Sequence, residues 1–402
     1  MMHTNRDRLI ADLLSDARVA LIQVREHLER RLRTGDSLRV KFGVDPSRPD
    51  LHIGHYVAFR KLRQFQQLGH TVVIIIGDWT AQIGDPTGRS TQRTMLTAEE
   101  VRNNARTYLD QLFRVIDVER AEIRHQSEWF GGFDLADVLR LTARYSVAQM
   151  LQREDFQKRI AENTSIGIVE LLYPLLQAYD SVAVAADVEI GGTDQTFNLL
   201  VGRDIQRASG QPPQDVLTVP LLVGLDGAMK MSKSADNYVG VAEVPVTSFG
   251  KLMSIPDRLI EQYYRLVTSV AGDDIDAIVQ AMHTGATNPR DVKAILAHTI
   301  VADLHGQEAA DFAQAEFERV FRDGATPSEI ADTLVDLPAT IQAILVSTRL
   351  ATSNNDARRL VEQGGVRLNN EVIDSVTTLI SLNEPAILRV GRRRFLRLVP
   401  RN

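Results

Sequence analysis

The stretch from Leu38 to Leu68 constrains the fold of this chain more than any other. It opens with an apolar run typical of a β-strand, and Asp45-Pro46 ends that run because proline fixes its own backbone and disfavours helix at the preceding residue. Beyond Asp50, a plausible N-cap, apolar residues recur at the spacing of one helical face. The continuous apolar run Thr71–Gly77 is typical of a buried parallel strand. Strand, helix and strand within about 40 residues predict a right-handed βαβ unit and an α/β nucleotide-binding fold.

Three residues at the start of the predicted helix are suited to phosphate. A helix N-terminus presents unpaired N–H groups and a partial positive charge. His52 and His55 are three residues apart and share one face, while Gly54 lets a base or ribose approach the backbone. By itself this pattern is more simply interpreted as two solvated histidines and a glycine without a role. A second motif far downstream changes the balance.

That motif is the run Lys230-Met231-Ser232-Lys233-Ser234. Two lysines three residues apart in a loop suit the triphosphate of a nucleotide, although alone they could be a solvated charge cluster. Together with His52–His55, in this order and at this separation, the run resembles the motif pair of the class I aminoacyl-tRNA synthetases. No G-x-G-x-x-G or G-x-x-x-x-G-K-[ST] motif occurs, and Gly84–Ser90 is only a near miss for the latter. The sequence therefore argues against a dinucleotide enzyme and a P-loop ATPase.

Between the two motifs lies a polar stripe. Tyr173, Gln177 and Asp180 are four and three residues apart, so they share one helical face. Such a stripe is usually solvated, but beside a buried strand it could line a polar pocket for a small amphipathic molecule. A predicted strand over 187–190 leads into the turn Gly191–Gln195, where the ribose of a ligand could sit. Leu217–Leu225 is predicted as the last strand before the lysines.

Composition narrows the class of protein. The 402 residues are enough for two or three domains, and the lack of cysteine excludes disulfides and makes structural zinc unlikely. The net charge is −6, yet the segment 339–402 carries ten arginines, no lysine and five acidic residues, a net of +5. A basic end module on an acidic body suggests local contact with nucleic acid. Without a long apolar run or a signal-peptide core, we expect a cytoplasmic protein with no membrane contact.

The remaining segments are predicted to be mostly helical. These are residues 6–33 as a surface helix, 98–160 as amphipathic helices, and 240–335 as helices with short loops. Near the C-terminus, Ser353 is a good N-cap and Gly364-Gly365 ends the helix that it begins. Two short strands are expected after that helix.

The combination of YxxLQAYD (173–180), GGTDQ (191–195) and KMSKS (230–234) resembles the tyrosyl-tRNA synthetases, and the resemblance covers essentially the whole chain. It implies a Rossmann-like α/β catalytic domain with a parallel sheet over 1–235. The helical insertion at about 98–160 forms the dimer interface in that family, so a homodimer is implied. A helical anticodon-binding domain over 236–335 and a small α+β RNA-binding domain over 339–402 would follow.

The resemblance also implies the chemistry: activation of L-tyrosine with ATP to tyrosyl-adenylate, then transfer to the 3′ end of tRNA(Tyr), releasing AMP and diphosphate. Mg²⁺ would enter with ATP, with no dedicated metal site, zinc or organic cofactor. The implied catalytic residues are His52, His55, Lys230 and Lys233. The implied ATP-binding residues are these four together with Gly54, Gly192, Asp194, Met231, Ser232 and Ser234. The implied tyrosine-binding residues are Asp85, Tyr173, Gln177, Asp180 and Gln195. The implied RNA-binding residues are Arg358, Arg359, Arg367, Arg392, Arg393 and Arg394, although exposed arginines are often merely solubilising.

Two other functions stay open. One is tryptophanyl-tRNA synthesis, against which Asp180, facing a phenol, and the GGTDQ turn argue. The other is an RNA-binding or splicing protein derived from a synthetase, against which the intact motifs argue. The chain also departs from the family, because Lys41 stands where many relatives place a tyrosine near the phenol.

Overall fold

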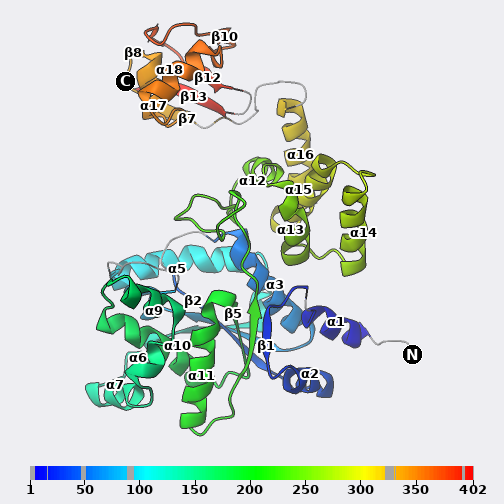
Figure 1. The fold of residues 1–402 in the computed structure, drawn as a ribbon, viewed down its shortest axis with the longest axis vertical. Helices are drawn as coiled ribbons and strands as arrows, with labels where there is room; N and C mark the ends of the chain where they lie inside the picture. Colours follow the sequence, from blue (N-terminus) through cyan, green and yellow to red (C-terminus); the bar gives the residue numbers. More distant parts are fainter. Residues whose placement is uncertain are drawn as a thin grey trace. The chain divides into compact units, whose positions relative to one another are not determined.

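The computed structural model describes residues 5–15, 17–46, 51–87, 95–321, 330, 332–391 and 394–401. The chain divides into two compact units, Met1–Gly306 and Gln307–Asn402 (Figure 1). Within the described residues, no helix is long and apolar enough to cross a membrane.

The first unit is built on a mainly parallel sheet with the strand order β1-β6-β5-β2-β3-β4. Its strands are β1 (Leu21–Gln23), β2 (Arg39–Val44), β3 (Thr71–Ile76), β4 (Ala121–His125), β5 (Val188–Gly192) and β6 (Asp215–Val219). Neighbours from β6 to β4 pair in parallel, and β1 joins β6 antiparallel. The predicted βαβ unit is confirmed as β2, α3 (Ile53–Gln67) and β3. Asp50 lies outside the described residues, and the N-cap position of α3 is His52.

Two strands of this sheet were not predicted. The segment predicted as one helix over 6–33 is α1 (Asn5–Leu13), β1 and α2 (Arg25–Thr34). The predicted helical segment 98–160 also contains β4, whose five residues are each half-buried. Both strands lie at an edge of the sheet, where a strand needs only one pairing partner and can be short.

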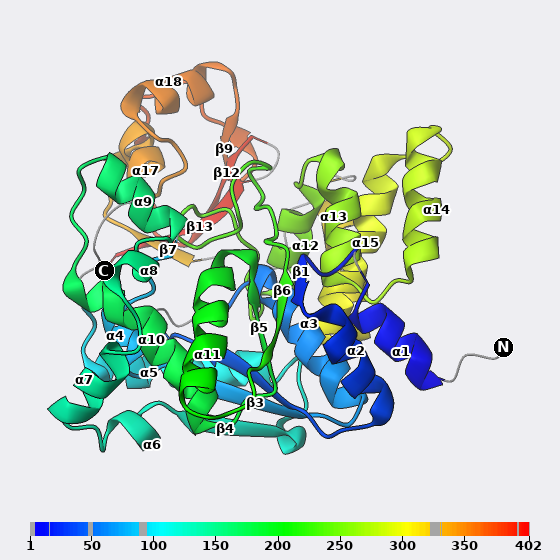
Figure 2. The same ribbon diagram turned by 60° about the horizontal axis from the view of Figure 1, so that its bottom comes forward.

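Helices cover the sheet and carry the polar stripe. α10 (Ile168–Ala183) and α11 (Thr196–Ala208) pack side by side, as Figures 1 and 2 both show. Pro174 lies inside α10. The insertion comprises α5 (Ala98–Leu112), β4, α6 (Ser127–Phe130), α7 (Leu135–Thr142), α8 (Val147–Met150) and α9 (Glu154–Ala161), and α4 (Thr80–Ile83) precedes it.

Further helices of the first unit follow the sheet: α12 (Pro245–Met253), α13 (Ile260–Val267), α14 (Gly272–His283) and α15 (Pro289–His305). Two of them, α13 and α15, contact α3 directly. The Tyr56 hydroxyl donates to Asp303 at 2.9 Å, and the Arg60 guanidinium donates to the carbonyl of Leu266 at 3.1 Å. The predicted helical character of 240–335 holds for these elements and for α16 (Gln307–Phe321), which belongs to the second unit.

The second unit is a small α+β module. Its sheet has the order β10-β9-β12-β13-β7, formed by β7 (Asp332–Val335), β9 (Val366–Leu368), β10 (Glu371–Val372), β12 (Ala386–Val390) and β13 (Arg394–Pro400). β8 (Ala339–Thr340) pairs with β11 (Leu379–Ile380), and α17 (Ile341–Ser347) and α18 (Asn354–Glu362) complete the core. Ser353 caps α18 as predicted, but the expectation of two strands was too low, because several of these strands are only two or three residues long.

Candidate active site

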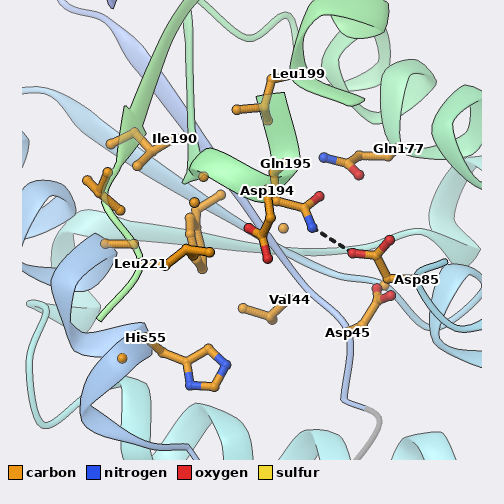
Figure 3. A pocket seen from close by; sticks show the side chains of 18 of the residues that line it. Val44, Asp45, His55, Asp85, Gln177, Ile190, Asp194, Gln195, Leu199 and Leu221 are labelled. Atoms are coloured by element: carbon orange, nitrogen blue, oxygen red, sulfur yellow. Dashed lines mark hydrogen bonds between the residues drawn. The ribbon is translucent and has the colours of Figure 1, made fainter. Parts of the chain in front are cut away.

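A cavity of about 380 Å³ lies at the carboxyl ends of β2 and β5, with lining residues from α3, α10 and the segment after β6. In the sheet, β2 lies between β3 and β5. The chain runs from β2 to β3 and β4 on one side and later returns to β5 and β6 on the other, so the connections diverge between β2 and β5. Such switch points are where open α/β sheets bind ligands. Figure 3 shows Val44, Ile190, Asp45, Asp85 and Gln195 around the same hollow.

The cavity brings together most of the residues predicted to bind ATP and tyrosine. Those lining it are His52, Gly54, His55, Asp85, Tyr173, Gln177, Asp180, Gly192, Asp194, Gln195, Lys230, Met231 and Ser232. The predicted residues outside the lining are Lys233 and Ser234. The cavity has two ends. We call one the histidine end, formed by His52, His55, Asp194 and Lys230, and the other the α10 end, formed by Asp85, Tyr173, Gln177, Asp180 and Gln195.

The two histidines are uncharged at neutral pH. Their ring centroids are 3.9 Å apart, and His52 donates its backbone N–H to Nδ1 of His55 at 3.2 Å. Burial, together with the nearby positive charge of Lys233, lowers the pKa of His55 to about 4. Burial and the neighbouring His55 lower the pKa of His52 even further. The rings therefore offer hydrogen bonds to a ligand rather than fixed positive charges.

The lysine run is anchored beside the histidines. Lys230 Nζ lies 2.7 Å from Asp194 Oδ2, and Lys233 Nζ lies 5.9 Å from the centre of the Tyr108 ring. Just after the run, Val239 accepts a backbone hydrogen bond from Ile53 at 3.0 Å. Two segments far apart in sequence thus form one wall of the cavity.

Two glycines keep space open at this wall. A Cβ on Gly54 would lie 2.8 Å from His52 Nδ1, and one on Gly192 would lie 2.6 Å from Asp194 Oδ1. Both distances are shorter than a Cβ contact tolerates, so any larger residue would displace a side chain predicted to bind ATP.

At the α10 end, carboxylates and amides are linked by hydrogen bonds. Gln195 Nε2 donates to Asp85 at 2.6 Å, drawn as the dashed line in Figure 3. The Tyr173 hydroxyl donates to Asp45 at 2.7 Å, and burial raises the pKa of Tyr173, so the hydroxyl keeps its proton. These acidic groups leave oxygen lone pairs beside the cavity, which suits a ligand ammonium group.

Asp180 is buried at the far end of the stripe, 2% exposed. Its two oxygens accept from Gln126 Nε2 at 2.8 Å and from Trp129 Nε1 at 3.2 Å. Burial raises its pKa to about 7, against the opposing positive charge of Lys41. Near neutral pH this carboxylate is poised between accepting and donating a hydrogen bond.

Lys41 does not line the cavity. Its ammonium group is fully buried and donates to the carbonyl of Gln177 at 2.7 Å and to the Ser181 hydroxyl at 2.8 Å. It also lies 2.9 Å from Glu189 Oε1. With three donors used by the protein, Lys41 supports α10 from behind the cavity.

Sequence reasoning missed four polar residues of the site: Asp45, Gln126, Trp129 and Glu189. Asp45 follows β2 at its carboxyl end and was interpreted only as a strand breaker, although acidic residues at that edge are a known signal for a site. Gln126 and Trp129 follow β4, which was not predicted, so no pattern placed them here. Glu189 alternates with apolar residues on a buried strand, and its 1% exposure could not be inferred from spacing.

The second unit carries the described members of the predicted RNA-binding set, Arg358, Arg359, Arg367 and Arg394, and all four are exposed. Arg392 and Arg393 lie outside the described residues. Arg359 pairs with Asp356 at 2.7 Å. Arginine carries its positive charge at any physiological pH and can therefore contact phosphate directly. Within the described part of the chain, no group of three or more His, Cys, Asp or Glu side chains could hold a metal ion.

Two family models match the chain. Residues 33–322 match the model for class I tRNA synthetases of the tryptophan and tyrosine type, and residues 340–384 match the S4 domain. The chain therefore belongs to this class of tRNA synthetases.

Among similar proteins, a tyrosine–tRNA ligase of Dehalococcoides mccartyi is 50% identical over 95% of this chain and 96% of its own length. One of Thermotoga maritima is 50% identical over 94% of each chain. Within the class, the chain falls among the bacterial tyrosyl-tRNA synthetases, as the motif combination predicted.

Solved structures agree on the fold. A truncated mitochondrial tyrosyl-tRNA synthetase of Aspergillus nidulans has a TM-score of 0.66 at 22% identity, covering 78% of this chain and 94% of its own. A tyrosyl-tRNA synthetase of Archaeoglobus fulgidus complexed with L-tyrosine has a TM-score of 0.62 at 21% identity, covering 77% and 100%. The predicted α/β class with a parallel-sheet core and a small C-terminal module is confirmed.

Proposed function

We propose that this tyrosine–tRNA ligase binds the side chain of L-tyrosine at the α10 end and ATP at the histidine end of the one cavity. The observation that carries the proposal is the buried Asp180 carboxylate, a hydrogen-bond acceptor that lines the cavity and lies far in sequence from His55 and from Lys230. A phenol hydroxyl supplies the donor that such an acceptor needs. Phenylalanine has no hydroxyl, so Asp180 would keep only its bonds from Gln126 and Trp129, and the complex would lack one hydrogen bond to a charged group, which contributes about 1.5–3 kcal/mol.

The amino group and carboxylate of tyrosine have partners in the same network. Asp85, Tyr173 and Gln177 would receive the α-ammonium group, and Gln195 would lie beside the carboxylate. Tyr173 and Gln177 lie on the same face of α10 as Asp180, and this places both ends of the amino acid along one helix.

Activation requires no nucleophile from the protein. The tyrosine carboxylate oxygen attacks the α-phosphorus of ATP, the bond to the bridging oxygen of the β-phosphate breaks, and diphosphate leaves with the electron pair. Positioning and stabilisation of the departing charge then supply the catalysis.

Lys230 and Lys233 would stabilise the β- and γ-phosphates, with Met231, Ser232 and Ser234 shaping the loop. The neutral His52 and His55 would donate to the phosphates and ribose, and Gly54, Gly192 and Asp194 would contact the adenosine. Mg²⁺ would arrive as part of the substrate, as the Mg²⁺ complex of ATP.

For transfer, we propose that the second unit binds tRNA(Tyr). The S4 match over 340–384 and the net charge of +5 over 339–402 support contacts from Arg358, Arg359, Arg367, Arg392, Arg393 and Arg394 to phosphates. The domain limits predicted from the sequence, 1–235, 236–335 and 339–402, remain part of this proposal. A cytoplasmic location, where charged tRNA is consumed, follows from it.

We also propose a homodimer formed by the insertion. Large apolar side chains are exposed on its short helices and at the start of α10: Leu135, Leu139, Val147, Ile160 and Ile168. Ile168 is 80% exposed, and a second copy of the same surface would cover such side chains. Sedimentation of the Leu139→Glu and Ile168→Glu variants tests this, and a wild-type monomer at micromolar concentration would contradict it.

The proposed activity is tested by ATP–diphosphate exchange without tRNA, using tyrosine, tryptophan and phenylalanine separately. Exchange with tyrosine alone is expected. Exchange that tryptophan supports equally would reject the assigned role of Asp180, and no exchange at all would reject the assignment of the cavity.

A further inference from the structure

The α10 end depends on a residue from the insertion that does not touch the cavity. Arg153 lies between α8 and α9, and its side chain is 3% exposed. The guanidinium donates to Asn198 Oδ1 at 3.0 Å and to Thr87 Oγ1 at 2.9 Å. Its charge is balanced by Asp155, to which it donates twice, at 3.0 and 2.8 Å. The guanidinium also lies 4.9 Å from the ring centre of Phe156.

Asn198 connects Arg153 to two residues of the site by hydrogen bonds. The side chain is 1% exposed, and its Nδ2 donates to Oε1 of Gln177 and to Oε1 of Gln195, both at 3.0 Å. The outer amide nitrogens then face acceptors. Gln195 Nε2 donates to Asp85 at 2.6 Å, and Gln177 Nε2 donates to Glu189 at 3.2 Å.

The hydrogen-bond directions in this network are set from two sides, because Arg153 can only donate and the carboxylates of Asp85 and Glu189 can only accept. An amide can be turned around so that its oxygen and nitrogen exchange places, but a guanidinium can only donate. Arg153 therefore holds the oxygen of Asn198 toward itself, and the nitrogen of Asn198 toward both glutamines. Each glutamine is in turn held with its oxygen inward and its nitrogen toward a carboxylate.

We infer that Arg153 is a positioning residue that fixes the hydrogen-bond direction around the ammonium group of the bound amino acid. The inference rests on the proposed tyrosine site and adds to it a determinant from the insertion. Without Arg153, Asn198 could turn its oxygen toward the Oε1 atoms of Gln177 and Gln195, while Asp85 and Glu189 still hold the outer amide nitrogens. Oxygen would then oppose oxygen at both glutamines, and Asp85 and Gln177 would lose the arrangement in which they meet the ammonium group.

Two tyrosine analogues separate this role from general support of the fold. Tyrosinol has the phenol and the ammonium group but no carboxylate, and 3-(4-hydroxyphenyl)propan-1-ol is the same molecule without the ammonium group. Their dissociation constants are measured by calorimetry on the full-length protein. In the Arg153→Gln variant we expect tyrosinol to bind about 10- to 100-fold more weakly, as for loss of a hydrogen bond to a charged group. The propanol should change by less than about threefold, because it carries neither of the groups that the network is proposed to meet and the phenol contacts are untouched.

A matched control is Arg159→Gln. Arg159 is equally buried in the same insertion and pairs with Glu170 at 2.7 Å, and its described hydrogen bonds go to Glu170 and Ser165, not to Asn198 or the two glutamines. Its loss should lower the melting temperature without separating the two analogues. Arg153→Lys, which retains a donor-only group but cannot reach Asn198 and Thr87 in the same geometry, should show the same selectivity to a smaller extent.

Equal weakening of both analogues in Arg153→Gln and Arg153→Lys, or no weakening of either, would overturn the inference. Failure of the proposed function is recognised separately, on the wild-type protein. There, absence of tyrosine-dependent diphosphate exchange rejects the site itself, whatever the Arg153 variants do.

Discussion

The two ends of the cavity are built from different kinds of interaction. At the histidine end, Lys230 is 44% exposed and its one described ion pair, with Asp194, faces the open cavity. At the α10 end, Asp180 is buried, and both its oxygens are hydrogen-bonded before any ligand arrives. The difference matches two tasks. Under the proposed function, charge that develops only during the reaction would be stabilised by partly exposed lysines, whereas discrimination between tyrosine and phenylalanine would rest on a fixed polar site.

The largest effect is expected at the histidine end. Replacing Lys233 by Ala removes a cation proposed to stabilise the departing diphosphate, and kcat for tyrosine activation should fall about 10²- to 10³-fold. The Michaelis constant for tyrosine should stay nearly constant, because the α10 end is intact. Rapid-quench measurement of adenylate formation checks both. The matched control is Lys158→Ala, a lysine 72% exposed on α9. Unchanged activation in Lys233→Ala would show that the comparison is wrong.

A smaller but more selective effect is expected for Asp180→Asn. An amide places its nitrogen against Gln126 or Trp129, both of which donate, and it cannot accept from the phenol with the same strength. We expect kcat/KM for tyrosine to fall about 100-fold, and kcat/KM for phenylalanine to change little. Steady-state exchange assays with both amino acids measure this, with Asp204→Asn, an exposed aspartate of α11, as the control. Equal losses for both amino acids would argue against a phenol contact.

The pH dependence should distinguish the two ends as well. Because burial raises the pKa of Asp180 to about 7, a fall in pH from 8 to 6 protonates it and removes the acceptor. The charged or titratable groups acting on it are Lys41 and Glu189, from β2 and β5. We expect kcat/KM for tyrosine to fall about tenfold over this range, while the Michaelis constant for ATP stays level because His55 titrates near pH 4. A flat tyrosine profile would contradict this, and Asp180→Asn should abolish the slope.

The smallest effect is predicted for Tyr173→Phe, which removes the hydroxyl that donates to Asp45 at 2.7 Å. Loss of one neutral donor should raise the Michaelis constant for tyrosine about three- to tenfold and leave that for ATP unchanged. Tyr179→Phe, on the same helix outside the cavity lining, is the control. A change mainly in the Michaelis constant for ATP would contradict the assignment of tyrosine to the α10 end.

The sequence predicted the parts of the site that local patterns reveal, and it missed the parts that depend on contacts between distant segments. The stripe of Tyr173, Gln177 and Asp180 was predicted because helical spacing is local, and the histidines were placed because a strand and prolines precede them. The partners of Asp180 could not be predicted. Gln126 and Trp129 follow a short edge strand whose residues are all half-buried, so no alternating pattern indicates the strand or what comes after it.

The burial of Arg153 likewise could not be predicted from local sequence. A charged residue between two short amphipathic helices is expected to be solvated, and only tertiary packing shows that it is buried among Asn198, Thr87 and Asp155. Likewise, the sequence identified Lys41 as a departure from relatives but not its fully buried pair with Glu189.

Two backbone contacts, one within the lysine run and one after it, limit how far the second lysine can move. Met231 donates to the carbonyl of Leu222 at 2.8 Å, and Val239 accepts from Ile53 at 3.0 Å, so the chain is fastened at both positions. The eight residue steps between them have a contour length of roughly 27 Å. Within this span, Ser232 donates its backbone N–H to Asn237 Oδ1 at 2.8 Å, so the segment is also held between its ends. Any movement of Lys233 toward a triphosphate would be confined to this short span, and we expect an insertion of a few residues here to slow the proposed activation step without altering the sheet.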